Sequence, residues 1–276
     1  MPPQSTKFYI SLRMLDIFLV QMEIAPNDKA RNFEKVETLT REIRKRTEDS
    51  VPGLIVLPEM FATGYLPLHP ERAAEDFSDE SSGETASFLN KLASQTGCAV
   101  MGAGISRKGP SLANHASVYL PGNPHEYASY DKRKPFFMEQ GKFTAGQDVS
   151  LFKIQEWNIA PTICFDLRFP ELYRDAVKAG ANLLTVQAAW PAERILHWDT
   201  LLQARAIENQ AYVVAVNCVT ADSKYNGHSR IIDPFGNIVA KADSNTECIV
   251  SARIEIEPLL RYRESFPVLK SILRVT

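Results

Sequence analysis

The sequence predicts an α/β protein whose sheets contain both parallel and antiparallel strand pairs and are covered by helices. Apolar runs of strand length alternate with segments of helical spacing at residues 15–57 and 159–219, which is typical of strands joined by crossover helices. Between them, residues 98–131 hold three strand-like runs separated by turn residues, which is typical of an antiparallel meander. About ten strands and four helices are expected in total.

The first unit of this pattern is a strand at residues 15–22, followed by a helix that Asp28 opens and that ends near residues 50–53. Residues 54–57, LIVL, form a continuous apolar run of the kind that makes a strand buried on both faces. A second helix, at 84–95, follows a loop rich in polar and turn residues.

In the meander, strands are expected at 98–106, 114–120 and 125–131. Residues 149–155 and 159–164 then predict a hairpin around a turn at 156–158. Beyond the hairpin, helices and strands follow to the end of the pattern: helix 170–180, strand 182–188, helix 193–209, strand 212–219, hairpin 230–239 and strand 248–256.

Length and composition favour a single soluble domain over residues 1–276, because no long linker or change in composition divides the chain. Hydrophobic residues make up 45% of the sequence, and the net charge of −2 gives no reason to expect a nucleic-acid partner. No run approaches the roughly 18 apolar residues of a membrane span, and the N-terminus lacks the ordered regions of a signal peptide. We therefore expect a cytoplasmic protein without a membrane partner.

Sequence patterns for metals and cofactors are weak. The four cysteines are widely spaced without a C-x-x-C pair, and the five histidines show no metal-binding spacing, so we expect reduced thiols and no metal. Residues 101–104, MGAG, lack the third glycine of a dinucleotide-binding loop and instead predict a strand whose backbone a neighbour approaches closely. No cofactor is expected.

Three of the predicted strands end in a reactive residue: Glu59, Lys132 and Cys164. Each has an ordinary alternative, as a loop acid, a surface cation and a small buried hydrophobe. However, the carboxyl ends of strands in α/β proteins are where loops carry chemistry on a rigid sheet. The coincidence therefore predicts a site that contains all three residues.

An acid, a cation and a thiol together are suited to acyl transfer through a thioester. A carboxylate takes the thiol proton as general base, and the thiolate attacks an amide or nitrile carbon. The Lys132 ammonium and the backbone N–H of Phe165, directly after Cys164, are suitable donors for the charge that develops on the substrate.

The residues around these positions resemble the three motif blocks of the nitrilase superfamily of carbon–nitrogen hydrolases: LPEMFATGY, YDKRKPFF and CFDLRFPELYR. Residues 197–217 and 227–243 are similar to later blocks, so the resemblance covers nearly the whole chain. It implies a four-layer α-β-β-α sandwich and homodimers. By motif match it also implies Glu59 as general base, Lys132 as oxyanion stabiliser and Cys164 as nucleophile.

Within the superfamily the chain is most similar to the ω-amidase branch, which implies a small-molecule substrate such as the side-chain amide of 2-oxoglutaramate or 2-oxosuccinamate, with release of ammonia. Residues 134–135 are Lys-Pro where this branch usually has His-Leu, and the following loop is shorter. The resemblance assigns Glu139 in that loop to substrate positioning, with a solvated surface acid as the alternative. Trp190 is expected to line the pocket, or to serve only in aromatic packing.

Two alternatives stay open at this point. One keeps the superfamily but changes the substrate, to that of a nitrilase or an N-carbamoyl amine hydrolase. The other is a noncatalytic member that retains the fold as a binding module, against which the intact set of Glu59, Lys132 and Cys164 argues.

Overall fold

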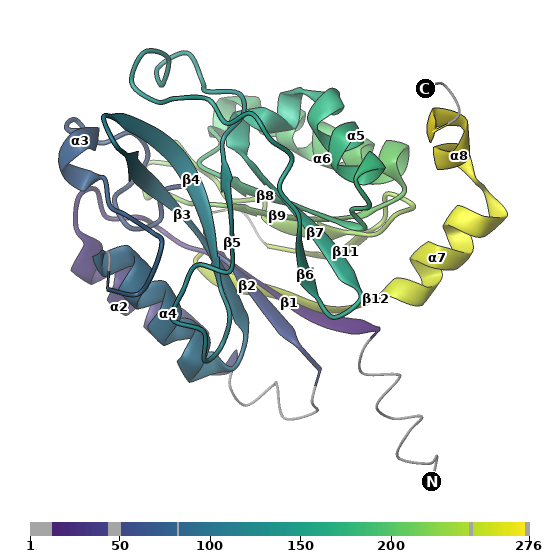
Figure 1. Ribbon diagram of the computed structural model, residues 1–276, viewed down its shortest axis with the longest axis horizontal. Helices are drawn as coiled ribbons and strands as arrows, with labels where there is room; N and C mark the ends of the chain where they lie inside the picture. The colour runs from purple at the N-terminus through teal and green to yellow at the C-terminus, as the bar shows by residue number, and fades with distance from the viewer. Residues whose placement is uncertain (1–12, 44–50, 82, 243–244, 274–276) are drawn as a thin grey trace, which may run out of the picture.

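The computed structural model describes residues 13–43, 51–81, 83–242 and 245–273 and shows a four-layer α-β-β-α sandwich (Figure 1). Two six-stranded sheets form its middle layers. The first sheet has the strand order β12 (Cys248–Glu255), β1 (Met14–Gln21), β2 (Gly53–Val56), β3 (Ala99–Lys108), β4 (Ser111–Tyr119) and β5 (Ala128–Asp131). The second has the order β11 (Ile238–Lys241), β10 (Arg230–Ile232), β9 (Tyr212–Asn217), β8 (Leu183–Ala188), β7 (Trp157–Ile163) and β6 (Phe152–Ile154).

Strand directions confirm the predicted mixture of parallel and antiparallel pairs. In the first sheet β1, β2 and β3 are parallel, and in the second β7, β8 and β9 are parallel. The predicted meander is the antiparallel run β3–β4–β5, and the predicted hairpin is β6–β7. Parallel strands end at a common edge, so β2 and β7 each bring a predicted reactive residue to the edge of its sheet.

Four of the helices cover the outer faces of the sandwich (Figure 1). Helices α2 (Lys29–Thr40) and α4 (Glu84–Thr96) cover the first sheet, and α5 (Pro170–Lys178) and α6 (Ile195–Asn209) cover the second. The Asp28 side chain accepts from the Arg31 N–H and caps α2, while Gly97 ends α4 at a φ of 73° that favours glycine.

The predicted extent of the first helix is wrong at its C-terminal end. Helix α2 ends at Thr40, about ten residues earlier than expected, and residues 41–42 continue as a turn. The Thr40 hydroxyl donates to the Val36 carbonyl, a local side-chain bond that competes with continued helix. Residues 44–50, where the predicted end falls, lie outside the described residues.

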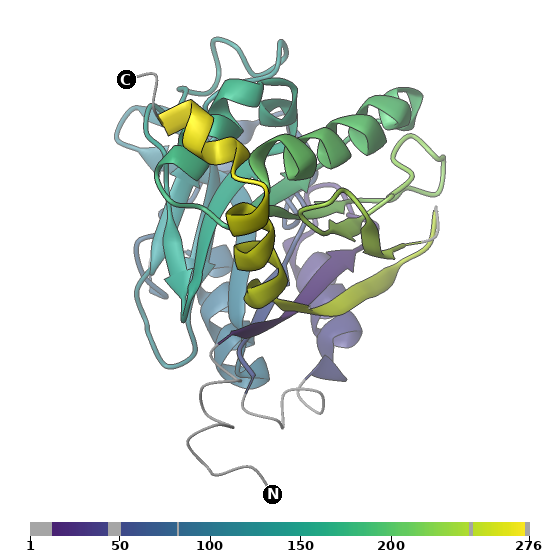
Figure 2. The ribbon, with the colours of Figure 1, turned by 90° about the vertical axis from the view of Figure 1, so that its right-hand side faces the viewer.

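Three short or C-terminal helices were not predicted: α3 (Pro70–Ala73), α7 (Ile256–Ser265) and α8 (Val268–Leu273). Figure 2 shows α7 and α8, in yellow, along one side of the sandwich. The described residues contain twelve strands, close to the expected number. None of the helices within the described ranges combines the length and the apolar character that crossing a membrane requires.

The core explains why the central strands read as continuous apolar runs. Along β1, Ile17 and Leu19 pack between the sheets, whereas Phe18 and Val20 pack beneath the helices on the other face. The predicted close approach at residues 101–104 is confirmed, because a Cβ at Gly102 would lie 2.7 Å from Leu89 Cδ2. Strands β1 and β2 are therefore buried on both faces, which holds their ends rigidly.

Candidate active site

The structure brings Glu59, Lys132 and Cys164 to one place from three strands of two sheets. Glu59 follows β2 after a Leu-Pro step, Lys132 directly follows β5, and Cys164 directly follows β7. Lys132 Nζ lies 2.9 Å from Glu59 Oε1, and both charges act on the Cys164 thiol. The three residues that were predicted to meet at the strand ends therefore do lie together.

Four buried polar side chains form the floor of this site, and we call them the charge cluster: Glu59, Lys132, Glu139 and Asn114. None is more than 1% exposed. Lys132 Nζ contacts Glu139 Oε2 at 2.9 Å as well as Glu59. The Asn114 amide donates to both Glu59 Oε1 and Glu139 Oε1 at 2.8 Å. One cation and one amide thus hold two carboxylates together in a dry environment, where unpaired charge is costly.

Backbone groups fix both carboxylates of the charge cluster from behind. Glu59 Oε2 accepts from the N–H of Ala189, just beyond β8, at 3.0 Å. Glu139 Oε2 accepts from the Phe136 N–H at 2.6 Å. The alternative interpretation of Glu139 as a solvated surface acid is therefore wrong, since this side chain is fully buried.

The turn that carries Cys164 is tight and strained. Cys164 has a φ of 48°, in the left-handed region that non-glycine residues seldom occupy, and it begins a 3₁₀ turn, η2 (Cys164–Arg168). Such conformations cost about 1–3 kcal/mol and persist where the surrounding structure imposes them. Here that structure includes the adjacent β7 strand and the buried carboxylate of Asp166.

Asp166 ties the nucleophile turn to the segment after Lys132. Its carboxylate accepts from the Tyr130 hydroxyl at 2.8 Å and from the N–H groups of Ile163 and Lys134 at 3.0 and 2.9 Å. Burial raises the pKa of Asp166 to about 6, against the effect of these hydrogen bonds. The strands that deliver Cys164 and Lys132 therefore share one anchor.

Electrostatics keep the resting thiol neutral. Burial raises the pKa of Cys164 well above its ordinary value, and the charge of Glu59 raises it further. Burial works against the charged form of Lys132, but Glu59, Cys164 and Glu139 together raise the pKa of Lys132 well above its usual range. Burial also raises the pKa of Glu139, opposed by Lys132. The geometry suits a proton transfer from thiol to carboxylate during attack on a substrate.

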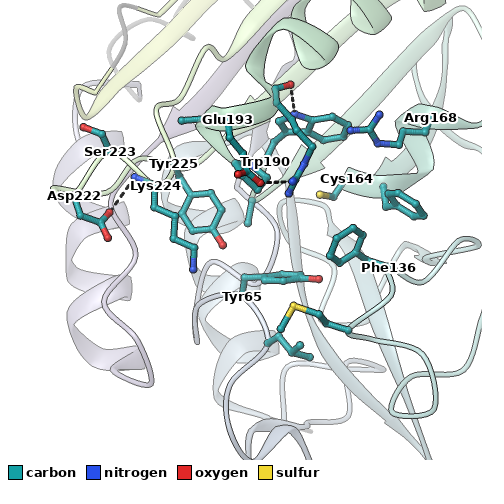
Figure 3. A pocket seen from close by; sticks show the side chains of 17 residues that line it. Tyr65, Phe136, Cys164, Arg168, Trp190, Glu193, Asp222, Ser223, Lys224 and Tyr225 are labelled. Atoms are coloured by element: carbon teal, nitrogen blue, oxygen red, sulfur yellow. Dashed lines mark hydrogen bonds and ion pairs between the residues drawn. The ribbon is translucent and has the colours of Figure 1, made fainter.

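A cavity of about 610 Å³ opens above Cys164 (Figure 3). Phe165 and Trp190, both predicted to contact substrate, line it, together with Tyr65 and Arg168. Glu139 lies in the charge cluster and is not part of the cavity wall. Glu59 and Lys132 are not among the lining residues either, so of the three predicted catalytic residues Cys164 is the one that lines the cavity.

Arg168 lies beside the cavity and contacts an aromatic ring and a histidine. Its guanidinium lies 4.8 Å above the Trp190 ring, and Nη2 is 3.2 Å from His197 Nδ1. Burial lowers the pKa of Arg168, and the charge of Arg194, which also lines the cavity, lowers it further. No carboxylate within the described ranges forms an ion pair with Arg168, so its charge faces the cavity without a counterion.

Reasoning from sequence missed Asn114, Tyr65 and the role of Arg168. Asn114 lies in the middle of a strand, where nothing marks it as different from a structural polar residue. Tyr65 belongs to the LPEMFATGY block and lies with its ring 5.9 Å from Lys132 Nζ, so the motif itself held a signal for it.

Comparisons with known proteins all indicate the same family. Residues 17–264 match the family model described as carbon-nitrogen hydrolase. The 2-oxoglutaramate amidase of Bacillus subtilis is 31% identical over 262 residues, which cover 93% of this chain and 96% of that protein. Omega-amidase YafV of Yersinia enterocolitica is 35% identical over 259 residues, covering 92% and 94%.

A solved structure gives the same result. XC1258 from Xanthomonas campestris, a CN-hydrolase superfamily protein with an arsenic adduct in its active site, superposes with a TM-score of 0.81 at 30% identity. The match covers 93% of this chain and 97% of that one.

Proposed function

Because the chain belongs to the carbon-nitrogen hydrolase family, we propose that it hydrolyses the side-chain amide of small α-keto acid amides, 2-oxoglutaramate or 2-oxosuccinamate, to the acid and ammonia. One observation carries this proposal. The Cys164 thiol stands between the buried Glu59–Lys132 pair and a cavity in which the Arg168 guanidinium has no counterion. The thiol is placed to react with the amide end of a substrate, and the Arg168 guanidinium is placed to bind a carboxylate at its other end.

In the first half-reaction Glu59 is the general base, Cys164 the nucleophile and Lys132 the oxyanion stabiliser. The thiol proton moves to Glu59 as Sγ forms a bond to the amide carbon, and the carbonyl electron pair moves to oxygen. The Lys132 ammonium and the Phe165 N–H donate to that oxygen. The protonated Glu59 then transfers its proton to the departing nitrogen, so that ammonia leaves and a thioester forms.

The second half-reaction uses the same groups in reverse. Glu59 takes a proton from water, the resulting hydroxide attacks the thioester carbon, and the thiolate leaves with the proton returned by Glu59. The carboxylate does not need to move between the steps, because Asn114 and the Ala189 N–H hold it in place. Glu139 positions Lys132 and, through it, the substrate oxygen.

The substrate class follows from the cavity above the thiol. A guanidinium that lacks a carboxylate partner and lies 4.8 Å from the centre of an aromatic ring is suited to bind a substrate carboxylate by charge-assisted hydrogen bonds. The names of the B. subtilis and Y. enterocolitica relatives support the same class. Simple nitriles and N-carbamoyl amines without an acid group would leave Arg168 unpaired.

The resemblance to the family supports further parts of the proposal. We propose a single cytoplasmic domain over residues 1–276 that needs no cofactor and assembles as a homodimer. Light scattering of the purified protein during gel filtration measures the assembly, and a mass of one chain would contradict the dimer.

The decisive measurement is ammonia release from a panel of four substrates: 2-oxoglutaramate, 2-oxosuccinamate, a simple nitrile and an N-carbamoyl amine. We expect release from the two keto-acid amides that is lost in Cys164→Ala. Turnover of another panel member alone would keep the catalytic assignment and reject the keto-acid amide. Full activity in Cys164→Ala would reject the nucleophile.

A further inference from the structure

His115 is adjacent to the charge cluster in sequence but lies on the opposite face of its strand. Asn114 points into the cluster, and side chains alternate along β4, so His115 points the other way. Its ring is 2% exposed, with Nδ1 2.6 Å from Asp131 Oδ1 and Nε2 2.8 Å from Glu126 Oε1. The mechanism above does not use this buried group.

These two contacts define the charge of the ring. A carboxylate only accepts hydrogen bonds, and a neutral imidazole has a single N–H, so only the imidazolium donates to both Asp131 and Glu126. Burial by itself lowers the pKa of His115, but the hydrogen bonds and charges of the two carboxylates outweigh it and raise the pKa above its ordinary value.

Three further side chains contact the His115 ring or the two carboxylates that it bonds. Lys108 of β3 pairs with the second oxygen of Asp131, the Ser117 hydroxyl donates to Glu126, and the Phe77 ring packs against the imidazole with centroids 5.3 Å apart. With the imidazolium, two cations face two carboxylates. A neutral ring keeps a single N–H, so one of the two carboxylates loses its hydrogen bond from the ring, and the group is left with one excess negative charge beside a buried side chain.

The backbone connects this arrangement to Lys132. His115 and Asp131 are cross-strand partners in the β4–β5 ladder, and Asp131 directly precedes Lys132. The Lys132 N–H donates to the Asn114 carbonyl at 2.9 Å, which continues the same ladder by one pair. A displacement of Asp131 therefore moves Lys132 relative to Glu59.

We propose that His115 is a positioning residue, whose cation between Asp131 and Glu126 fixes the end of β5 and with it the Lys132 ammonium. The inference rests on the catalytic role proposed for Lys132 and not on the identity of the amide. As pH rises through the pKa of His115, the ring loses one donor and kcat falls. Lys132 itself does not produce this alkaline limb, because its pKa lies well above the usual range.

The test is the pH profile of kcat, measured with whichever amide of the panel the wild type hydrolyses. Glu126→Gln removes one carboxylate that favours the imidazolium, so the alkaline limb moves to lower pH. His115→Arg keeps a cation at every pH, so the limb moves to higher pH or disappears. His115→Gln lowers kcat roughly tenfold to a hundredfold at neutral pH with little change in KM. The matched control is Glu156→Gln, at an exposed turn, which leaves the profile unchanged.

An alkaline limb at the same pH in wild type, Glu126→Gln and His115→Arg would overturn the proposal. If His115→Arg does not fold, the pH profile of Glu126→Gln is the test by itself, because that variant retains the imidazole ring of His115. If the wild type hydrolyses only the nitrile or the N-carbamoyl amine, the proposed keto-acid amide substrate is rejected. The pH profile is then measured with the compound that is hydrolysed. If the wild type hydrolyses no panel member, alkylation of Cys164 replaces kcat: a well-placed Lys132 lowers the thiol pKa, so Glu126→Gln must react more slowly than wild type above neutral pH.

Discussion

The two walls beside Cys164 are built from different kinds of structure. On one side, three members of the charge cluster lie on or just beyond strands of the first sheet, Glu139 lies in the loop after β5, and all four side chains are at most 1% exposed. On the other side, the cavity is lined by the 3₁₀ turn after β7 and by loop residues 189–194 and 222–225. There Arg194 and Lys224 are partly or fully exposed.

This difference separates the bond-breaking step from the choice of substrate. A group on the end of a hydrogen-bonded strand cannot shift without breaking the ladder, so the base and the cation keep one geometry. Loop residues can change without disturbing the sheet, so they can change the substrate. Substitutions in the charge cluster should therefore lower kcat, whereas substitutions in the loop wall should raise KM.

The largest effect is expected at the thiol between the two walls. Cys164→Ala removes the atom that forms the thioester, so kcat should fall by at least roughly 10⁴-fold. The melting temperature should change little, because alanine has the same backbone strain at a φ of 48° and the substitution removes only one side-chain atom beside the cavity. Cys248→Ala, at a partly exposed strand position, is the matched control and should keep full activity.

Glu59→Gln tests the charge-cluster wall with the smallest change of shape. The amide keeps the size of the side chain but cannot accept the thiol proton, so kcat should fall roughly 10²- to 10⁴-fold with KM nearly constant. Steady-state kinetics on the amide that the wild type hydrolyses measures both values. Glu139→Gln retains the base and should therefore show a smaller decrease in kcat. An equal decrease in kcat in the two variants would show that Glu59 is not the base.

Arg168→Leu tests the loop wall. Loss of a charge-assisted hydrogen bond to a substrate carboxylate costs about 1.5–3 kcal/mol, which is roughly a tenfold to hundredfold loss in kcat/KM. The loss should lie mainly in KM and should vanish for a simple aliphatic amide without a carboxylate. An equal loss for both substrates would place Arg168 in the bond-breaking step and remove the distinction between the walls.

The features that the sequence predicts well are local ones, and the features that it misses depend on contacts between distant parts of the chain. Strands β2, β5 and β7 were predicted within a few residues, and the motif blocks placed Glu59, Lys132 and Cys164 correctly at their ends, because apolar runs and strand-end residues are local features. Asn114 and His115 were not singled out, since their roles depend on pairing between β4 and β5. The early end of α2 and the counterion-free Arg168 also depend on tertiary contacts that no local pattern contains.

The smallest expected effect concerns Asp166, which joins the nucleophile turn to the segment after Lys132. Its pKa of about 6 in the folded protein lies above the roughly 3.9 of an unfolded chain. The folded state therefore binds the proton more tightly, and this contribution to stability is complete below about pH 4 and is lost as pH rises through about 6. The change amounts to at most about 3 kcal/mol.

Asp166→Asn removes this titration. Relative to wild type, the variant's free energy of unfolding should therefore improve as pH rises from about 4 to 7, as measured by chemical denaturation at several pH values. A difference between the two proteins that stays constant over this range would mean that Asp166 is ionised throughout. In that case the nucleophile turn would be anchored by a buried charge, as the charge cluster is, and its stability would not depend on the protonation of Asp166.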